Sequence, residues 1–179
     1  MFRAVCLIIG AVGVAGCGFD GRSPAAPTAP GLTGAATSLE GVVEAASGSA
    51  HRIRPLPDGE LFVLTFTAQK RADGTATGYA HVDRKDVDVA FDVDVTCLSV
   101  VGNTAWIGGI IQNARGGLAQ NGTVSYFYVI DNGEGTDAPL DLASAIRLND
   151  RDGEDLRFCT DRPLLLPATE IAHGNVQVR

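Results

Sequence analysis

The sequence predicts an all-β domain, either an antiparallel β-sandwich or a small β-barrel of about eight strands. Apolar and polar residues alternate with a period of two through residues 75–95, which is typical of strands with one buried face. Glycine-containing turn pairs separate this stretch from its neighbours at short intervals. No ten-residue helical repeat follows the N-terminal segment. Together these observations favour an antiparallel sheet over a helical or mixed fold.

The first residues predict export. "MFR" supplies one positive charge, and "AVCLIIGAVGV" is an uncharged run too short to remain as a membrane-spanning helix. The sequence "VAGC" that ends this segment, residues 14–17, resembles the lipobox of bacterial lipoproteins. That resemblance implies a signal peptide over residues 1–16, cleaved before Cys17, and a diacylglycerol group on the Cys17 thiol. The alternative is an ordinary signal peptide followed by a chance cysteine.

The rest of the chain divides into a tether and one domain. Residues 18–37 are almost wholly Gly, Ala, Pro, Ser and Thr, so they cannot bury enough apolar surface to offset their ordering entropy. We therefore expect a lipidated cysteine and flexible tether over residues 17–37, and a single β domain over residues 38–179. The net charge of −7 and the lack of a polybasic stretch argue against nucleic acid as a partner. The lipid predicts a location in the cell envelope, at the outer membrane or the outer face of the cell membrane.

Four cysteines divide between these segments. Cys6 lies in the signal peptide and Cys17 takes the lipid, so Cys97 and Cys159 remain in the domain. In an oxidising envelope compartment two remaining cysteines most simply form a disulfide. Two buried free thiols are the alternative, and a zinc pair has less support because no CxxC motif or histidine cluster accompanies them.

The first hairpin has a register that the apolar pattern selects. Strands are expected over residues 39–50 and 60–71, and the second of them turns into the alternating stretch. A three-residue loop at 72–74, with its glycine left-handed in a G1 bulge, sets Phe66 opposite Ala80. A two-residue loop would turn the phenylalanines toward solvent, so the longer loop is predicted.

The second hairpin joins the alternating stretch to "DVDVAFDVDV", residues 86–95, whose aspartates lie on one face and whose apolar residues lie on the other. Aspartate is a poor strand former, so the alternation itself predicts the strand. A two-residue turn at Arg84 and Lys85 is expected, which sets Val82 opposite Val87.

The third hairpin is expected to turn at residues 102–103, a Gly-Asn pair. This turn sets Cys97 opposite Gly108 and Ser99 opposite Trp106, with both pairs on the core side. Further strands are expected over residues 123–131, 143–148 and 174–178.

Three segments of the domain resemble known sequences. "VTCLSVVGNTAWIGGI", "VIDNGEG" and "GNVQV" are similar to segments of a group of uncharacterised exported bacterial β-proteins, and the similarity covers roughly residues 60–179. The resemblance implies a secreted β fold and does not indicate an activity.

A row of aspartates on the second hairpin is one candidate site. Asp88, Asp92 and Asp94 lie on the polar face with Asp86, and neighbours two residues apart are about 6.5–7 Å apart along a strand. Carboxylates at that spacing serve as acid and base in a hydrolase. The alternative is a charged face that prevents edge-to-edge aggregation, with His81 opposite Asp88 as a surface pair.

The acidic stretch "VIDNGEGTDAPLD", residues 129–141, is the candidate metal site. It fails the EF-hand template, because each alignment of a glycine at position 6 puts Ile130 at a ligand position. The available oxygens belong to Asp131, Asn132, Glu134, Asp137 and Asp141. An irregular calcium site remains open beside the simpler interpretation, a turn at a strand end.

No motif for a catalytic nucleophile, a catalytic metal or a nucleotide occurs in the chain. The sequence therefore favours a protein that is not an enzyme and needs no cofactor. It predicts a lipid-anchored envelope domain that binds or scaffolds an envelope protein or a glycan. The alternatives are a calcium-dependent binding module that uses residues 131–141 and a hydrolase that uses Asp88, Asp92 and Asp94.

Overall fold

A computed structural model describes residues 41–53, 61–85, 87–135 and 137–179. These residues belong to a compact unit that spans Ser38–Arg179 and contains the core, the strand pairings and the disulfide described below. The predicted signal peptide, Cys17 and the tether lie outside the described residues. Within the described part of the chain, no helix is long and apolar enough to cross a membrane.

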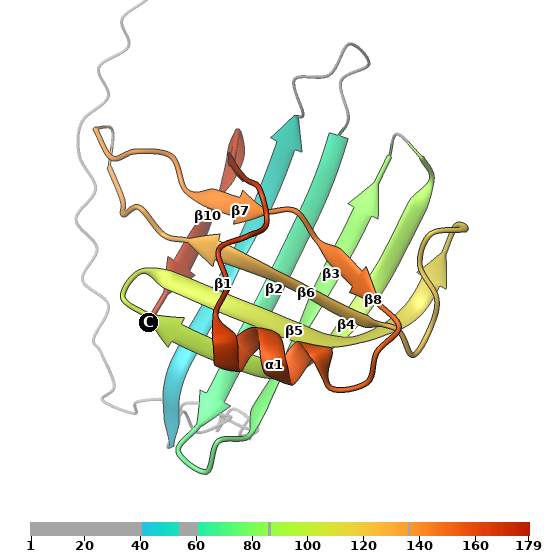
Figure 1. The fold of residues 1–179 in the computed structure, drawn as a ribbon. Coiled ribbons are helices and arrows are strands. Elements are labelled where there is room, and N and C mark those ends of the chain that lie inside the picture. Colours follow the sequence, from blue (N-terminus) through green and yellow to red (C-terminus); the bar gives the residue numbers. More distant parts are fainter. Residues whose placement is uncertain (1–40, 54–60, 86, 136) are drawn as a thin grey trace, which may run out of the picture. The chain divides into compact units, whose positions relative to one another are not determined.

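Ten strands and one short helix make up the described fold, and all strand pairs are antiparallel (Figure 1). The all-β prediction is therefore confirmed. The elements are β1 (Val42–Ile53), β2 (Leu61–Arg71), β3 (Ala76–Arg84), β4 (Val89–Val101), β5 (Thr104–Arg115), β6 (Val124–Ile130), β7 (Leu142–Ser144), β8 (Arg147–Asn149), α1 (Glu154–Asp161), β9 (Ala168–Glu170) and β10 (His173–Val178).

The sheet curls, and its two end strands, β10 and β9, are neighbours in the chain. The strand order is β10-β1-β2-β3-β4-β5-β6-β7-β9, and only Ile171 and Ala172 separate β9 from β10 in the chain. The C-terminal segment thus pairs first with β7 and then with β1. Because β7 and β8 pair with successive parts of β6, they are one interrupted strand. This order has nine strand positions, against about eight predicted, and β8 lies off the path beside β6. We call the curled sheet the barrel.

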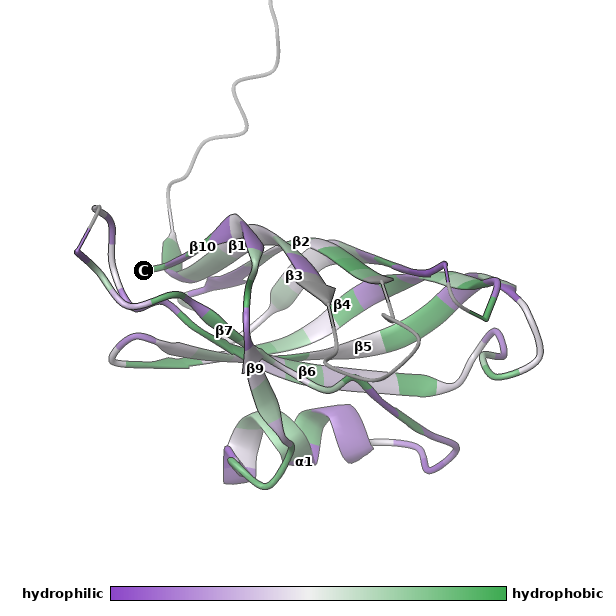
Figure 2. Cartoon of the chain, turned by 90° about the horizontal axis from the view of Figure 1, so that it is seen from above, coloured by the Kyte–Doolittle hydropathy of each residue, from purple (hydrophilic) through white to green (hydrophobic). Residues whose placement is uncertain are grey.

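The barrel is flattened into two layers. Figure 2 shows β1, β2, β3 and β10 in one layer and β5, β6, β7 and β9 in the other, with α1 outside the second layer. Apolar side chains from both layers fill the interior, and the rings of Phe66 and Phe127 meet edge to face there with centroids 5.6 Å apart. Such pairs stabilise a core beyond the area that they bury.

Two of the three predicted hairpin registers are confirmed. Phe66 pairs with Ala80 across β2 and β3, and the loop between these strands ends in Gly74 with φ 87°. The Gly-Asn turn between β4 and β5 sets Val101 opposite Thr104. The first prediction depended on an apolar pattern that only one turn length satisfies, and the second on the Gly-Asn pair at residues 102–103.

The turn predicted at Arg84 and Lys85 is wrong. Arg84 instead ends β3 and pairs with Val89, and residues 85, 87 and 88 have turn conformations. The two registers differ by an even number of residues, so both bury the same face and the apolar pattern does not choose between them. Asp88 adopts φ 49° in the turn, a left-handed conformation that aspartate tolerates better than most residues.

The pairing of Ser99 with Trp106 is confirmed, but the predicted side is wrong. A bulge between Val95 and Cys97 moves Cys97 and Trp106 to the outer face of the barrel. They are buried there by α1, a helix too short to leave a ten-residue repeat in the sequence.

The helix is fastened to the outer face by covalent and polar contacts. Cys97 and Cys159 form the predicted disulfide, with their Cα atoms 6.2 Å apart. Trp106 and Phe158 belong to one buried apolar cluster, and the indole Nε1 of Trp106 donates to the Pro163 carbonyl at 3.1 Å. The buried Asp155 accepts a hydrogen bond from the Thr96 hydroxyl of β4. The disulfide therefore joins two surfaces that also pack together.

Candidate functional site

The acidic stretch of residues 129–141 joins the free side of β10 to the rest of the barrel. Asp141 is 7 % exposed, and its Oδ2 accepts a hydrogen bond from the Val176 amide at 2.8 Å. Its Oδ1 accepts one from the Asn132 amide at 2.8 Å, which fixes the loop itself. One buried carboxylate thus connects the last strand to the loop before β7.

Asp131 repeats this arrangement. Its Oδ2 accepts from the Val178 amide at 3.0 Å and its Oδ1 from the Gly133 amide at 2.9 Å. In an antiparallel ladder alternate amides face away from the paired strand. Val176 and Val178 hold such positions on β10, so side-chain carboxylates replace a backbone ladder there. Glu134 adds an exposed hydrogen bond, in which its Oε1 accepts from Asn175 Nδ2 at 2.7 Å.

The same contacts bear on the calcium hypothesis. Asn132 donates its Nδ2 to the Leu140 carbonyl at 2.6 Å, and Asp137 is exposed. In the described ranges, no three or more His, Cys, Asp or Glu side chains are grouped so that they could hold a metal ion. Calcium binding by Asp131, Asn132, Glu134, Asp137 and Asp141 stays a prediction. In the structure, Asp131 and Asp141 instead bind backbone amides of β10. Neither the calcium hypothesis nor the interpretation as a turn predicted this contact.

The row of aspartates on β4 is shorter than predicted. Asp88 lies exposed in the turn, Asp94 is exposed on the strand, and Asp92 alone is surrounded by donors. His81 faces Asp92 and not Asp88, because the true register of this hairpin differs from the predicted one. The predicted pair of His81 and Asp88 is therefore wrong.

Three donors converge on the Asp92 carboxylate. The Tyr79 hydroxyl and His81 Nδ1, the latter at 2.7 Å, contact Oδ1, and Asn113 Nδ2 donates to Oδ2 at 2.9 Å. Partial burial acts to raise the pKa of Asp92, but these hydrogen bonds outweigh it and lower the pKa to about 2. The hydrogen bond to Asp92, with burial, raises the pKa of Tyr79 to about 12. At neutral pH this leaves a carboxylate and a neutral phenol.

The Tyr79→Phe variant is expected to raise the pKa of Asp92 from about 2 toward its ordinary value of 3.8. A carboxylate with a depressed folded pKa stabilises the fold above its unfolded pKa, and the gain is lost as pH falls through the folded pKa. In the variant the loss should therefore begin at higher pH. Tyr79 is 43 % exposed, so we expect the stability change at neutral pH to stay within about 1 kcal/mol.

An NMR titration of the Asp92 carboxyl, with unfolding curves at pH 7 and pH 3, measures both effects. Tyr126→Phe is the matched control, because Tyr126 packs on Phe158 under the helix. An unchanged Asp92 titration in Tyr79→Phe would contradict the assignment of the hydrogen bond.

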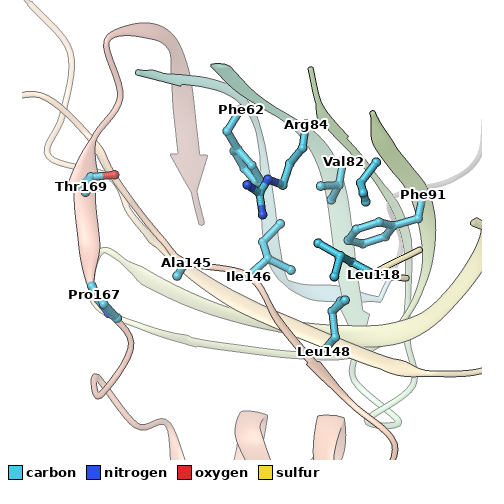
Figure 3. A pocket seen from close by; sticks show the side chains of 11 residues that line it. Phe62, Val82, Arg84, Phe91, Leu118, Ala145, Ile146, Leu148, Pro167 and Thr169 are labelled. Atoms are coloured by element: carbon cyan, nitrogen blue, oxygen red, sulfur yellow. The ribbon is translucent and has the colours of Figure 1, made fainter. Parts of the chain in front are cut away.

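A cavity of about 200 Å³ lies inside the barrel, between the strands of the two layers (Figure 3). Six apolar side chains form most of its wall: Val82, Val89, Phe91, Leu118, Ile146 and Leu148. The volume somewhat exceeds the ~150 Å³ of an engineered apolar cavity that takes up benzene. The space is therefore large enough for a small organic molecule.

The interruption between β7 and β8 borders this space. Ala145 and Ile146 lie between the two strands, and the Ala145 amide donates to the Pro167 carbonyl at 2.8 Å and not to β6. The small Ala145 side chain lines the cavity on this side, and Leu118, which is 62 % exposed, contributes from the loop between β5 and β6. Residues of irregular backbone thus form part of the cavity wall.

Arg84 is the one charged side chain among the described residues that line the cavity. It is half-buried at the end of β3, and Figure 3 shows its guanidinium directed inward beside Phe62. Sequence reasoning missed this position because it assigned Arg84 to a turn. Alternation offered the signal, since Arg84 follows Ala80 and Val82 on the inward face.

The described residues form a curled antiparallel β-sheet with an apolar cavity and one inward-facing arginine in the cavity wall. Comparison of the chain with protein-family models, with curated proteins and with solved structures gave no match.

Proposed function

We propose that the chain is a lipid-anchored protein of the bacterial cell envelope whose barrel binds a small apolar molecule without converting it. The observation that carries this proposal is the apolar cavity inside an otherwise filled barrel. Small β-barrels are either filled by side chains or hold one small ligand. Concave apolar sites with a few polar groups are also the usual form of small-molecule sites.

Two independent features support the envelope location: the N-terminal segment and the disulfide. The segment that ends at Cys17 resembles a lipobox, and a polar tether of Gly, Ala, Pro, Ser and Thr follows it. The disulfide between Cys97 and Cys159 adds support, because such bonds persist in oxidising compartments outside the cytosol.

A binding role without catalysis agrees with the chemistry of the polar groups. Asp92 is the described carboxylate with the most side-chain donors, and its pKa of about 2 leaves it ionised and a weak base near neutral pH. General bases act best when their pKa lies near the working pH. The cavity wall is mostly apolar, which suits retention of a ligand better than proton transfer to it.

Binding of 1-octanol to residues 18–179, measured by calorimetry, tests the cavity. We expect one molecule per chain, and Leu118→Asn should weaken binding at least fivefold because it places an amide in the wall. Leu165→Asn is the matched control, since Leu165 is 89 % exposed and lies outside the cavity wall. Absence of binding to octanol and to carboxylates of the same length would overturn the proposed function, as would equal effects of the two variants.

The Cys17→Ala variant tests the anchor. Loss of the thiol removes the attachment point for lipid, so the protein should move from the membrane fraction to the soluble fraction of cells. Immunoblots of both fractions measure this shift, with Cys6→Ala as the control that leaves Cys17 in place. An unchanged distribution would contradict the lipobox interpretation.

A further inference from the structure

We infer that a hollow on the outer face of β3, β4 and β5 binds a neutral saccharide, with the ring of Tyr79 beside the sugar. The hollow has a volume of about 450 Å³, which lies within the roughly 300–1,000 Å³ of small-molecule sites. Its wall is formed by His81, Phe91, Asp92, Asn113, Ala114 and Arg115. Apart from Phe91 it shares no residue with the wall of the apolar cavity, so this second site does not rest on the proposed function.

A bulge in β5 shapes the wall of the hollow. The register of β4 and β5 shifts between Ala90 and Asp92, and the extra residue lies on β5. Asn113 adopts φ 51° there, a left-handed conformation that residues other than glycine rarely adopt. The Ala114 amide donates to Asn121 Oδ1 at 2.8 Å, which fixes the bulge. Bulges redirect side chains next to functional sites, and strained backbone of this kind is concentrated at such sites. Here the bulge directs Asn113 Nδ2 to Asp92 Oδ2, at 2.9 Å.

The charges around the hollow favour a ligand without net charge. With its pKa of about 2, Asp92 is ionised at neutral pH, and the exposed Asp94 lies on the same face of β4, so an anion is repelled. Arg115 in the wall repels a cation, and three side-chain donors already contact the Asp92 carboxylate. The described residues also do not supply the three or more His, Cys, Asp or Glu side chains that a metal site would need. A neutral, polar molecule is the class that remains.

A sugar ring matches the hydrogen-bonding groups and the exposed ring beside them. Sugar hydroxyls both donate and accept hydrogen bonds. The Asp92 carboxylate and the Asn113 amide oxygen accept from such hydroxyls, and the Arg115 guanidinium donates to them. The hydroxyl of Tyr79 is held by Asp92, and its side chain is 43 % exposed, which leaves an aromatic face for the C–H groups of a pyranose. A saccharide thus uses the polar wall and the exposed ring together.

Amide NMR spectra of residues 18–179, recorded with millimolar glucose, galactose, mannose or N-acetylglucosamine, test the site. We expect at least one of these neutral sugars to shift the resonances of Tyr79, Asp92 and Asn113 in a saturable way. The amino-sugar and uronic-acid forms of the sugar that binds should bind at least threefold more weakly, because each carries a charge. No shift with any of the four sugars would overturn the saccharide site. Charged forms that bind as tightly as the neutral sugar would overturn the selection of a neutral ligand.

Two variants locate the binding in the hollow. Asn113→Gly removes the amide and suits the left-handed backbone, so it should fold and weaken sugar binding at least fivefold. Arg162→Gly is the matched control, since Arg162 also has a positive φ, 50°, but lies at the end of α1 outside this wall. Tyr79→Ala should weaken binding at least fivefold, and Tyr79→Phe, which keeps the ring, should weaken it less. Sugar affinity that is unchanged in Asn113→Gly and Tyr79→Ala would overturn the assignment, and thermal unfolding verifies that each variant is folded.

Discussion

Replacing Asp141 with alanine is expected to lower the free energy of unfolding by about 3 kcal/mol, because two backbone amides lose a charged acceptor. The Val176 amide is buried and the Asn132 amide is partly buried, so water does not fully replace the lost carboxylate. Asp141→Asn keeps one acceptor oxygen and should lose less. Urea unfolding curves of the three proteins measure the differences.

Asp137→Ala is the matched control, since Asp137 belongs to the same loop and is exposed. Its stability should stay within about 0.5 kcal/mol of the wild type. The melting temperature of the wild type is also expected to be unchanged by millimolar calcium, because the Asp131 and Asp141 oxygens already accept backbone hydrogen bonds. A large, chelator-sensitive rise with calcium would contradict this account of the loop and restore the metal site.

Reducing the disulfide between Cys97 and Cys159 is expected to cost about 4 kcal/mol, the entropy that a bond across 62 residues removes from the unfolded chain. The joined surfaces also share the ring contact between Tyr126 and Phe158 and the hydrogen bond from Trp106 to Pro163. We therefore expect α1 to remain docked in the reduced protein, which unfolds at lower urea concentration.

The Cys97→Ala/Cys159→Ala variant should unfold at the same urea concentration as the reduced wild type, and added reductant should leave it unchanged. Near-ultraviolet circular dichroism of Trp106 reports whether the helix stays in place. A variant as stable as the oxidised protein would show that packing alone fixes α1.

Sequence reasoning succeeded where one apolar pattern permitted one arrangement. The alternation around Phe66 selected a three-residue loop, because a one-residue slip would have exposed the ring. The prediction of a turn at Arg84 failed, because shifting the register of β3 and β4 by an even number of residues buries the same face. Sequence reasoning also misplaced Trp106, because the bulge after Val95 reverses the faces of the strand without a mark in the sequence.

The candidate sites were harder to predict for a different reason. The contact between Asp141 and Val176 joins positions far apart in the chain, and no local spacing encodes it. The cavity is a property of the space between elements, and its wall includes Ala145 and Ile146, which belong to no motif. The alternation that places Arg84 on the inward face was the one local feature of the sequence that indicated a polar group in the cavity wall.

Closure by the last strand has a consequence for how the chain reaches this fold. One edge of β1 pairs with β2, which is nearby in sequence. The other edge pairs with β10 at the end of the chain, where Ala46 lies opposite Val178. Contacts between such distant positions form slowly. Until they form, a twelve-residue strand presents unpaired amides and carbonyls, the template on which other chains aggregate. A substitution that only delays this pairing would thus lower the yield of refolded protein while leaving the stability of the folded molecules unchanged.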